Sequence, residues 1–285
     1  MTNKISIKNL SFSYDQNNLV LKNFQFDIFT NNIYFLFGLN ASGKSTLCNL
    51  IAGLIPLVSG EINYFDEVRV FNKKTSKKFF HLVNQRISMV FQNSQKQLFS
   101  ENIFEDVLYG LKKNNYKLVE SQQLAKKWLD YFKIPNDLYD KSFFELSIGQ
   151  QRKVALASIF CLDKKCYILD EPTIGLDYET KKILFNLLKE LRNQGKIIIV
   201  ISHDFDWAYI LADECLMLHN HELVLVDKVQ EFFSNSLIKE IFHYEPFISK
   251  LLNDLSKHKK FNNLLSLNIK DISSLVQFLK EGKNY

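Results

Sequence analysis

Residues 38–45 carry the side chains and glycines needed to bind phosphate. The segment reads GLNASGKS, fits GxxxxGK[ST] and stands between the apolar run YFLF and the helix-like sequence TLCNLIAGL. Glycines let such a loop turn its N–H groups toward phosphate oxygens, and a helix N-terminus favours negative charge. Lys44 would neutralise the β- and γ-phosphates, and the Ser45 hydroxyl would bind Mg²⁺. The candidate nucleotide-binding residues of this P-loop are Gly38, Asn40, Ala41, Ser42, Gly43, Lys44, Ser45 and Thr46.

Two carboxylates, Asp170 and Glu171, follow the apolar run CYIL. Ligands in doubly wound folds bind at the carboxyl ends of parallel strands, which is where this pair would stand. Acidic residues also start many loops, but the P-loop favours a catalytic interpretation. Asp170 is then expected to bind Mg²⁺, directly or through water, and Glu171 to orient and polarise the attacking water.

Two further apolar runs, ISMVF and KIIIVIS, end in Gln92 and His203. A single glutamine or histidine at a strand end is usually a cap or a turn residue. If the runs are neighbouring parallel strands, however, both side chains could converge on the phosphate site.

A second helix N-terminus suited to phosphate begins in LSIGQ (residues 146–150), just before the helical sequence QRKVALASIF. Its candidate binding residues are Ser147, Gly149 and Gln150. Serving the same nucleotide as the P-loop would require the fold to bring this segment across an inserted helical region. A head-to-tail dimer, with each nucleotide between the P-loop of one chain and LSIGQ of the other, is the simpler geometry.

The hydrophobic pattern indicates the elements that hold these motifs. Alternation at Phe24, Phe26 and Ile28 follows a first strand around Ile5 and Ile7, which predicts an antiparallel β-rich start. From residue 33 onward, the runs YFLF, ISMVF, CYIL, KIIIVI and ECLML alternate with helical stretches, as in a helix-covered parallel sheet. The sequence therefore predicts an α/β domain over 1–227, with a helical subdomain inserted at 93–160 and a small helical appendage at 228–285.

Composition limits the class of protein. The chain has 285 residues, 46% of them hydrophobic, and a net charge of +5. The start, MTNKISIKNL, lacks a signal pattern, and the apolar runs are too short to cross a bilayer, so a cytoplasmic protein is expected. Four cysteines without a CxxC pair suggest free thiols, and His219 and His221 around Asn220 indicate a hairpin turn rather than a metal site. No stacking pattern suggests nucleic-acid binding.

From residue 4 to about 226 the motifs, in this order and spacing, resemble the ABC ATPase family within the P-loop NTPases. The resemblance implies ATP and Mg²⁺ as ligands and a dimer. It implies that Tyr14 in SFSYD stacks on adenine. Without the resemblance, the alternating pattern of that strand would predict that Tyr14 is a core aromatic. Gln92 matches the Q-loop, which contacts γ-phosphate and Mg²⁺, and His203 matches the switch histidine. The segment 173–177, ending in Asp177, matches the D-loop that crosses the dimer.

The stretch FQNSQKQLFSENIFEDVLYG (91–110) resembles the ATPases of energy-coupling factor (ECF) transporters, which take up vitamins or transition metals. Their QLF and DV lie near a groove for the membrane partner, so Leu98 and Phe99 are expected there. Residues 229 to about 280 resemble their dimerising tail, and FFELSIGQ is closer to the second of their two ATPase paralogues. Implied partners are a second ATPase subunit, identical or paralogous, a transmembrane coupling subunit and a small membrane-embedded substrate-binding subunit, at the cytoplasmic face of the cell membrane.

Two residues depart from the family pattern. Ile148 stands where the family usually has glycine, and its β-branched side chain removes backbone freedom. We expect activity to survive, since Ser147 and Gly149 are present, but the site completed for the partner to be weaker than its twin. Ala41, often glycine, is expected to matter less.

Alternatives remain at this stage. An ordinary ABC importer or exporter subunit is the chief one. A non-transport ABC ATPase would be expected to carry two ATPase domains or a long coiled coil, neither of which is present. A P-loop kinase or GTPase would leave LSIGQ unexplained.

Overall fold

A six-stranded sheet forms the centre of the computed structural model, which describes residues 3–15, 18–65, 67–70, 77–93, 97–257, 264 and 269–281. The strand order is β10-β9-β3-β8-β7-β6, and every pair is parallel except β9 with the edge strand β10. Every residue of β7 and β8 is buried, as expected for a parallel sheet covered on both faces. The strands are β3 Asn32–Gly38, β6 Ile87–Val90, β7 Cys166–Asp170, β8 Ile197–Ile201, β9 Glu214–His219 and β10 Glu222–Lys228.

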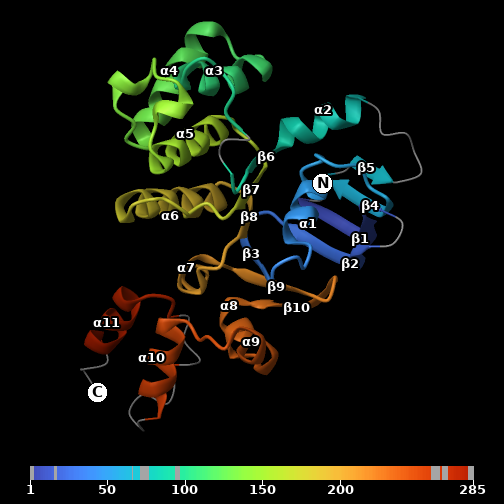
Figure 1. The fold of residues 1–285 in the computed structure, drawn as a ribbon. Coiled ribbons are helices and arrows are strands. Elements are labelled where there is room, and N and C mark those ends of the chain that lie inside the picture. Colours follow the sequence, from blue (N-terminus) through green and yellow to red (C-terminus); the bar gives the residue numbers. More distant parts are fainter. Residues whose placement is uncertain are drawn as a thin grey trace.

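A second, antiparallel sheet is formed by the N-terminal part of the chain, as the alternation predicts. Its order is β2-β1-β4-β5, and it lies beside the helix α1 in Figure 1. Apolar side chains of β1 and β2 form one core cluster with α1 and one face of the central sheet. The elements are β1 Lys4–Ser13, β2 Leu19–Phe29, α1 Lys44–Ile51, β4 Ser59–Tyr64, β5 Glu67–Val70 and α2 Lys77–Arg86.

A group of helices lies between β6 and β7 in sequence and stands apart from the antiparallel sheet, at the top of Figure 1. Apolar faces of α3, α4 and α5 pack on one another and continue into the cluster on the second face of the central sheet. The helices of this group are α3 Ile103–Lys113, α4 Leu118–Tyr131 and α5 Ile148–Phe160, with short 3-10 turns at Asn136–Leu138 and Phe143–Glu145. Two further helices follow later in the chain, α6 Tyr178–Asn193 after β7 and α7 Phe205–Leu211 after β8.

The C-terminal part is helical, and its helices gather below the central sheet in Figure 1. An aromatic cluster joins them to the sheet, because Phe37 of β3 stacks on Phe232 with ring centroids 5.3 Å apart. Asp206 of α7 also accepts hydrogen bonds from the Phe247 N–H, at 2.6 Å, and from the Tyr244 hydroxyl. The helices are α8 Val229–Ser234, α9 Ser236–Phe242, α10 Phe247–Ser256 and α11 Ile272–Glu281.

Candidate functional site

The P-loop connects β3 to α1 through a tight turn of backbone. Gly43 has φ 101°, and a Cβ atom there would lie 2.8 Å from the Val20 carbonyl oxygen, so both the conformation and the space require glycine. Ala41 also has a positive φ, 62°, which a side chain tolerates at a cost. The usual glycine of the family therefore has a conformational reason at this position.

Lys44 reaches back over the loop that precedes it. Its Nζ donates hydrogen bonds to the carbonyl oxygens of Gly38, at 2.8 Å, and Leu39, at 3.0 Å. Burial lowers the pKa of Lys44, while the carboxylates of Asp170 and Glu171 raise it. The ammonium group is thus held at the mouth of the loop, where phosphate oxygens could replace the two carbonyl groups as its partners.

A pocket of about 300 Å³ opens beside the P-loop, which is within the range of small-ligand sites. Tyr14 borders it with 64% of its surface exposed, and its hydroxyl lies 3.2 Å from Thr46 Oγ1. This exposure contradicts the reading of Tyr14 as a core aromatic and leaves its ring available for stacking. The pocket is lined by Tyr14, Val20, Ala41, Ser42, Gly43, Lys44, Ser45 and Thr46.

Asp170, at the end of β7, faces the first turn of α1. The Ser45 hydroxyl donates a hydrogen bond to Asp170 Oδ2 at 2.9 Å. Burial raises the pKa of Asp170, and the bond from Ser45 opposes that effect. A hydroxyl and a carboxylate at this distance are oxygen donors of the type that Mg²⁺ prefers, so the pair fits a hard divalent cation.

Glu171 is held in an unusual conformation next to Asp170. Its φ of 48° lies in the left-handed region, which costs a non-glycine residue on the order of 1–3 kcal/mol. Its Oε1 is buried without a hydrogen-bond partner among the described residues, although His203 Nε2 lies 3.5 Å away. Burial raises the pKa of Glu171, and His203 partly offsets this. A carboxylate with a raised pKa and one buried oxygen that lacks a hydrogen bond in the described part of the chain suits a group that accepts a proton from water.

Gln92 and His203 follow the two strands that flank β7. Because β6, β7 and β8 are adjacent and parallel, their carboxyl ends share one edge of the sheet. His203 lies beside Glu171, whereas Gln92 is exposed just beyond β6. The helix cap after β8 is Asp204, whose Oδ1 accepts the Trp207 N–H at 2.9 Å. His203 is therefore not the capping residue of α7.

The LSIGQ segment lies at the start of α5 and outside the P-loop pocket. Ser147 is the N-cap, its Oγ accepts the Gln150 N–H at 3.3 Å, and Gln150 Oε1 accepts the Ser147 N–H at 2.9 Å. The capping box satisfies the N–H groups of Ser147 and Gln150. The N–H groups of Ile148 and Gly149 have no acceptor within the helix, because they belong to its first turn. Ile148 is 74% exposed. No residue of LSIGQ lines the P-loop pocket.

Asp177 begins α6 close to the same helix. It caps α6 by accepting the Thr180 N–H at 2.7 Å, and it forms an ion pair with Lys153 of α5 at 2.9 Å. The bond from Thr180, and then Lys153, lower the pKa of Asp177. A Cβ atom added at Gly175, two residues earlier, would lie 3.3 Å from Ile148 Cγ2. The D-loop segment and LSIGQ of one chain are therefore in contact.

The QLF sequence divides between the core and the surface. Gln97 Nε2 donates to the Ala155 carbonyl oxygen at 2.9 Å, and Leu98 is only 6% exposed within the core cluster. The prediction that Leu98 lies at a partner surface is therefore wrong, because its side chain is needed inside the helical group. Phe99 is 67% exposed and packs edge-to-face on Tyr109 at 4.8 Å.

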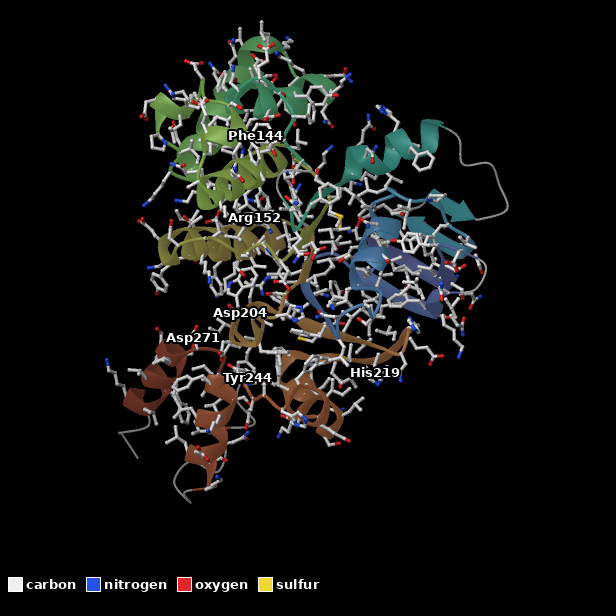
Figure 2. All side chains as sticks on the ribbon, viewed as in Figure 1. Phe144, Arg152, Asp204, His219, Tyr244 and Asp271 are labelled. Atoms are coloured by element: carbon white, nitrogen blue, oxygen red, sulfur yellow. The ribbon has the colours of Figure 1, made fainter. Side chains whose placement is uncertain are left out.

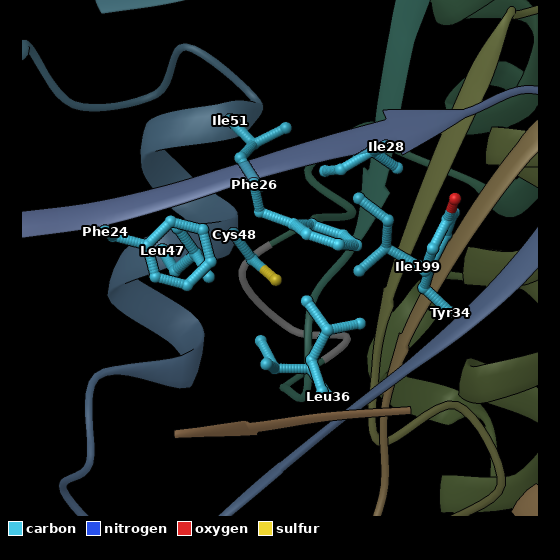
Figure 3. A pocket seen from close by; sticks show the side chains of 10 residues that line it. Phe24, Phe26, Ile28, Tyr34, Leu36, Leu47, Cys48, Ile51 and Ile199 are labelled. Atoms are coloured by element: carbon cyan, nitrogen blue, oxygen red, sulfur yellow. The ribbon is translucent and has the colours of Figure 1, made fainter. Parts of the chain in front are cut away.

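The cavity between the antiparallel sheet and the central sheet is too small for a nucleotide. The apolar cavity in Figure 3 lies between β2, α1 and the central sheet and holds only about 20 Å³. Among the described residues, no group of three or more metal-binding side chains occurs. His219 and His221 flank the β9–β10 turn, where Asn220 and His221 both have positive φ, as the predicted hairpin requires.

Sequence reasoning missed two basic residues of α5. Lys153 pairs with Asp177, and Arg152 is buried at the ends of β6 and β7. The available signal was two adjacent cations in QRKVALASIF, a helix that is otherwise largely apolar beyond its first turn. Only the fold shows which one turns inward.

Comparison with known proteins gives one consistent result. Residues 21–174 match the family described as ABC transporter. The energy-coupling factor transporter ATP-binding protein EcfA2 of Lactobacillus johnsonii is 35% identical over 77% of this chain and 76% of its own length. The EcfA2 protein of Streptococcus agalactiae is 34% identical over 98% of this chain and 99% of its own length.

Solved structures give the same family. CbiO1 from Clostridium perfringens, part of the ABC transporter complex cbiONQ, has a TM-score of 0.70 and 27% identity, over 89% of this chain and 100% of its own. The bacterial ABC transporter cassette MJ0796, solved as a dimer, has a TM-score of 0.71 and 25% identity, over 79% and 98%. The chain belongs to the ATP-binding subunits of ABC transporters, in the branch of the energy-coupling factor ATP-binding proteins.

Proposed function

We propose that this chain hydrolyses ATP to energise an ECF-type ABC transporter for vitamins or transition-metal ions. The observation that carries the proposal is the division of the site. The P-loop, Asp170, Glu171 and His203 meet at one edge of the central sheet, whereas LSIGQ faces outward on another part of the chain. Such a division suits a nucleotide bound between two subunits.

ATP would occupy the P-loop pocket with its phosphates at the N-terminus of α1. The N–H groups from Gly38 to Thr46 and the Lys44 ammonium would bind the β- and γ-phosphates. Tyr14 would stack on adenine. Ser45 and Asp170, with Gln92 approaching from the end of β6, would hold Mg²⁺, which neutralises phosphate charge when it is bound.

Hydrolysis would depend on Glu171. Its carboxylate would orient the attacking water and accept a proton, and His203 would contact the γ-phosphate from the adjacent strand end. Positioning and electrostatic stabilisation would supply most of the rate enhancement, because phosphoryl transfer needs little covalent participation by the protein.

The second half of the site would come from another ATPase subunit, identical or paralogous. Its Ser147, Gly149 and Gln150 would approach the γ-phosphate, and Asp177 would cross the interface. The exposure of Ile148 and its contact with the D-loop support this face as the dimer surface. We further propose 1–227 as the ATPase domain, 93–160 as its inserted helical subdomain and 228–285 as a dimerisation appendage.

Membrane partners would connect the ATPase cycle to transport. Among the described residues, no helix is long and apolar enough to span a membrane. We propose that a transmembrane coupling subunit binds the surface around Phe99 and Tyr109, and that a small membrane-embedded subunit binds the substrate. The chain would then lie at the cytoplasmic face of the cell membrane.

An ordinary ABC importer or exporter subunit is the competing function. Relatives named as energy-coupling factor proteins align along 98% of this chain, tail included, which favours the ECF assignment. Affinity purification of the chain from solubilised membranes separates the two. We expect a second ATPase chain, one coupling subunit and a small membrane protein, whereas a pair of large transmembrane subunits alone would contradict the proposal.

The partner surface can be tested in the same purification. Phe99→Asp should reduce recovery of the coupling subunit about tenfold or more, since a buried unpaired charge costs on the order of several kcal/mol, while ATP binding is retained. Val119→Asp is the matched control, because Val119 is also 67% exposed and lies in the same group of helices, on α4. Equal recovery from both variants would contradict the assigned surface.

A further inference from the structure

Arg152, which Figure 2 labels, is a buried cation in the second turn of α5. Only 2% of its surface is exposed. Burying a charge is costly unless hydrogen bonds compensate for lost hydration, and a guanidinium group has five N–H donors to satisfy. Its environment therefore has to supply several acceptors in a defined geometry.

Those acceptors come from two adjacent strand ends that carry the catalytic side chains. Two of the acceptors, at Phe91 and Gln92, directly follow β6. The others lie at Asp170, the last residue of β7, and at the two residues after it. The distances to the carbonyl oxygens of Gln92 and Asp170 are 3.2 and 2.9 Å. The guanidinium nitrogens donate to the main-chain carbonyl oxygens of Phe91, Gln92, Asp170, Glu171 and Pro172.

The hydrogen bond to Glu171 bears on its left-handed backbone. A strained residue keeps its conformation only when the surroundings hold it on both sides. The Glu171 N–H donates to the Ile201 carbonyl oxygen at 2.9 Å, and the Glu171 carbonyl oxygen accepts from Arg152. Arg152 thus holds one side of the peptide that directs the Glu171 carboxylate toward His203.

The same side chain joins the three parts of the site. α5 begins with LSIGQ, β6 leads into Gln92, and β7 leads into Asp170 and Glu171. A planar guanidinium binds several acceptors in fixed directions, which a flexible ammonium does not. Movement of α5 would therefore be transmitted to the main chain at both strand ends.

We propose that Arg152 is a positioning residue for ATP hydrolysis, which orients Glu171 and Gln92 through their main-chain carbonyl groups and links them to the helix that carries LSIGQ. The proposal rests on the catalytic assignment of Glu171 made above. Arg152 has no place in nucleotide binding itself, because it does not line the P-loop pocket.

Arg152→Lys tests this in the full chain with its partners, because lysine keeps the positive charge and loses the planar guanidinium group with its several fixed donors. We expect kcat to fall about tenfold or more, since small misplacements of catalytic groups have effects of this size. Affinity for a fluorescent ATP analogue should change less than about threefold, because the P-loop contacts are intact. Arg192→Lys is the matched control: Arg192 pairs with Asp213 at 3.0 Å, away from these strand ends, and its kcat should be unchanged.

A double-mutant cycle with Glu171→Gln separates positioning from general stability. If Arg152 acts through Glu171, Arg152→Lys should reduce the residual rate of the Glu171→Gln variant only slightly. A full tenfold loss in that background would overturn the link. Rapid turnover by Glu171→Gln alone would instead contradict the catalytic assignment and leave the kcat effect of Arg152→Lys to be judged separately.

Thermal unfolding of each variant completes the test. Arg152→Gln, which keeps two amide donors and buries no charge, serves as a second variant. It should likewise lower kcat and leave the affinity for the ATP analogue nearly unchanged. A kcat within about twofold of wild type in a folded variant would overturn the proposal. Failure of both variants to fold would show a purely structural role and overturn it as well.

Discussion

The two helix ends proposed to bind phosphate in this chain are built differently. At the P-loop, Lys44 and Ser45 already have partners, the carbonyl groups of the loop and Asp170, and a pocket lies beside them. At the start of α5, the Ser147 hydroxyl accepts a hydrogen bond from the Gln150 N–H of its own capping box, and the side chain of Ile148 is exposed. A preorganised half and an exposed half are what the proposed site, shared between two chains, requires.

Lys44→Ala should have the largest effect and should act on the P-loop half alone. Loss of charge-assisted bonds to phosphate costs about 2–3 kcal/mol, so ATP affinity should fall about 100-fold. Titration with a fluorescent ATP analogue measures this. Lys8→Ala is the control, because Lys8 pairs with Glu61 on the surface. Unchanged affinity in Lys44→Ala would contradict the assigned pocket.

Glu171→Gln should preserve ATP binding and lower kcat by at least about 100-fold, the contribution of a general base. The closed dimer should then accumulate with ATP, which size-exclusion chromatography detects. Brisk turnover would refute the assignment.

The pH dependence of wild-type turnover tests the same residue. Burial raises the pKa of Glu171, and the base is active only when ionised. The rate should therefore decline with falling pH from a higher pH than an ordinary glutamate would give. This decline should be missing from the residual rate of Glu171→Gln. If the same decline at low pH appears in both proteins, a residue other than Glu171 causes it.

Ser147→Ala should impair the part of the site that LSIGQ supplies to the partner chain. Hydrolysis by the assembled dimer should fall about tenfold, because a bond to a charged oxygen is lost, while the isolated chain binds ATP as before. Asn102→Ala is the matched control, because Asn102 caps α3 in the same way, through the Glu105 N–H. It removes about 1 kcal/mol of helix capping without touching nucleotide. Equal losses in both variants would attribute the effect to folding.

Ile148→Gly should have the smallest effect. It returns backbone freedom to the LSIGQ segment and removes the methyl group next to Gly175, so the complex should hydrolyse ATP about two- to threefold faster. Steady-state ATPase measurements on the assembled complex decide it. An unchanged or lower rate would show that Ile148 does not weaken the site completed for the partner.

The apolar patterns predicted the central sheet well, since each of the five runs forms one parallel strand. These strands are buried on both faces, and burial leaves a strong signal in sequence. The patterns did not predict β4, β5 or α2, in residues 59–86. β4 and β5 belong to the antiparallel sheet, and α2 lies against β6 at the edge of the central sheet. Polar residues interrupt the periodicity in these segments, and the neighbouring elements decide their conformation.

Motifs contained in one short segment could be read from the sequence, whereas the direction of single side chains that depends on distant contacts could not. Leu98 and Phe99 are neighbours of similar hydrophobicity, yet Leu98 enters the core and Phe99 faces outward. Arg152 and Lys153 are adjacent cations, yet one is buried at two strand ends and the other pairs with Asp177. Direction of this kind is set by how α5 packs on the sheet.

By itself, the sequence determined the P-loop motif, the two carboxylates after CYIL and which apolar runs form the parallel strands, because these depend on local residue types and on burial along single segments. Only the tertiary structure decided that Tyr14 borders the P-loop pocket, that His203 lies 3.5 Å from Glu171 and that LSIGQ lies outside that pocket. Each of these relations joins segments far apart in the chain, and their distance is set by packing between elements rather than by any local preference.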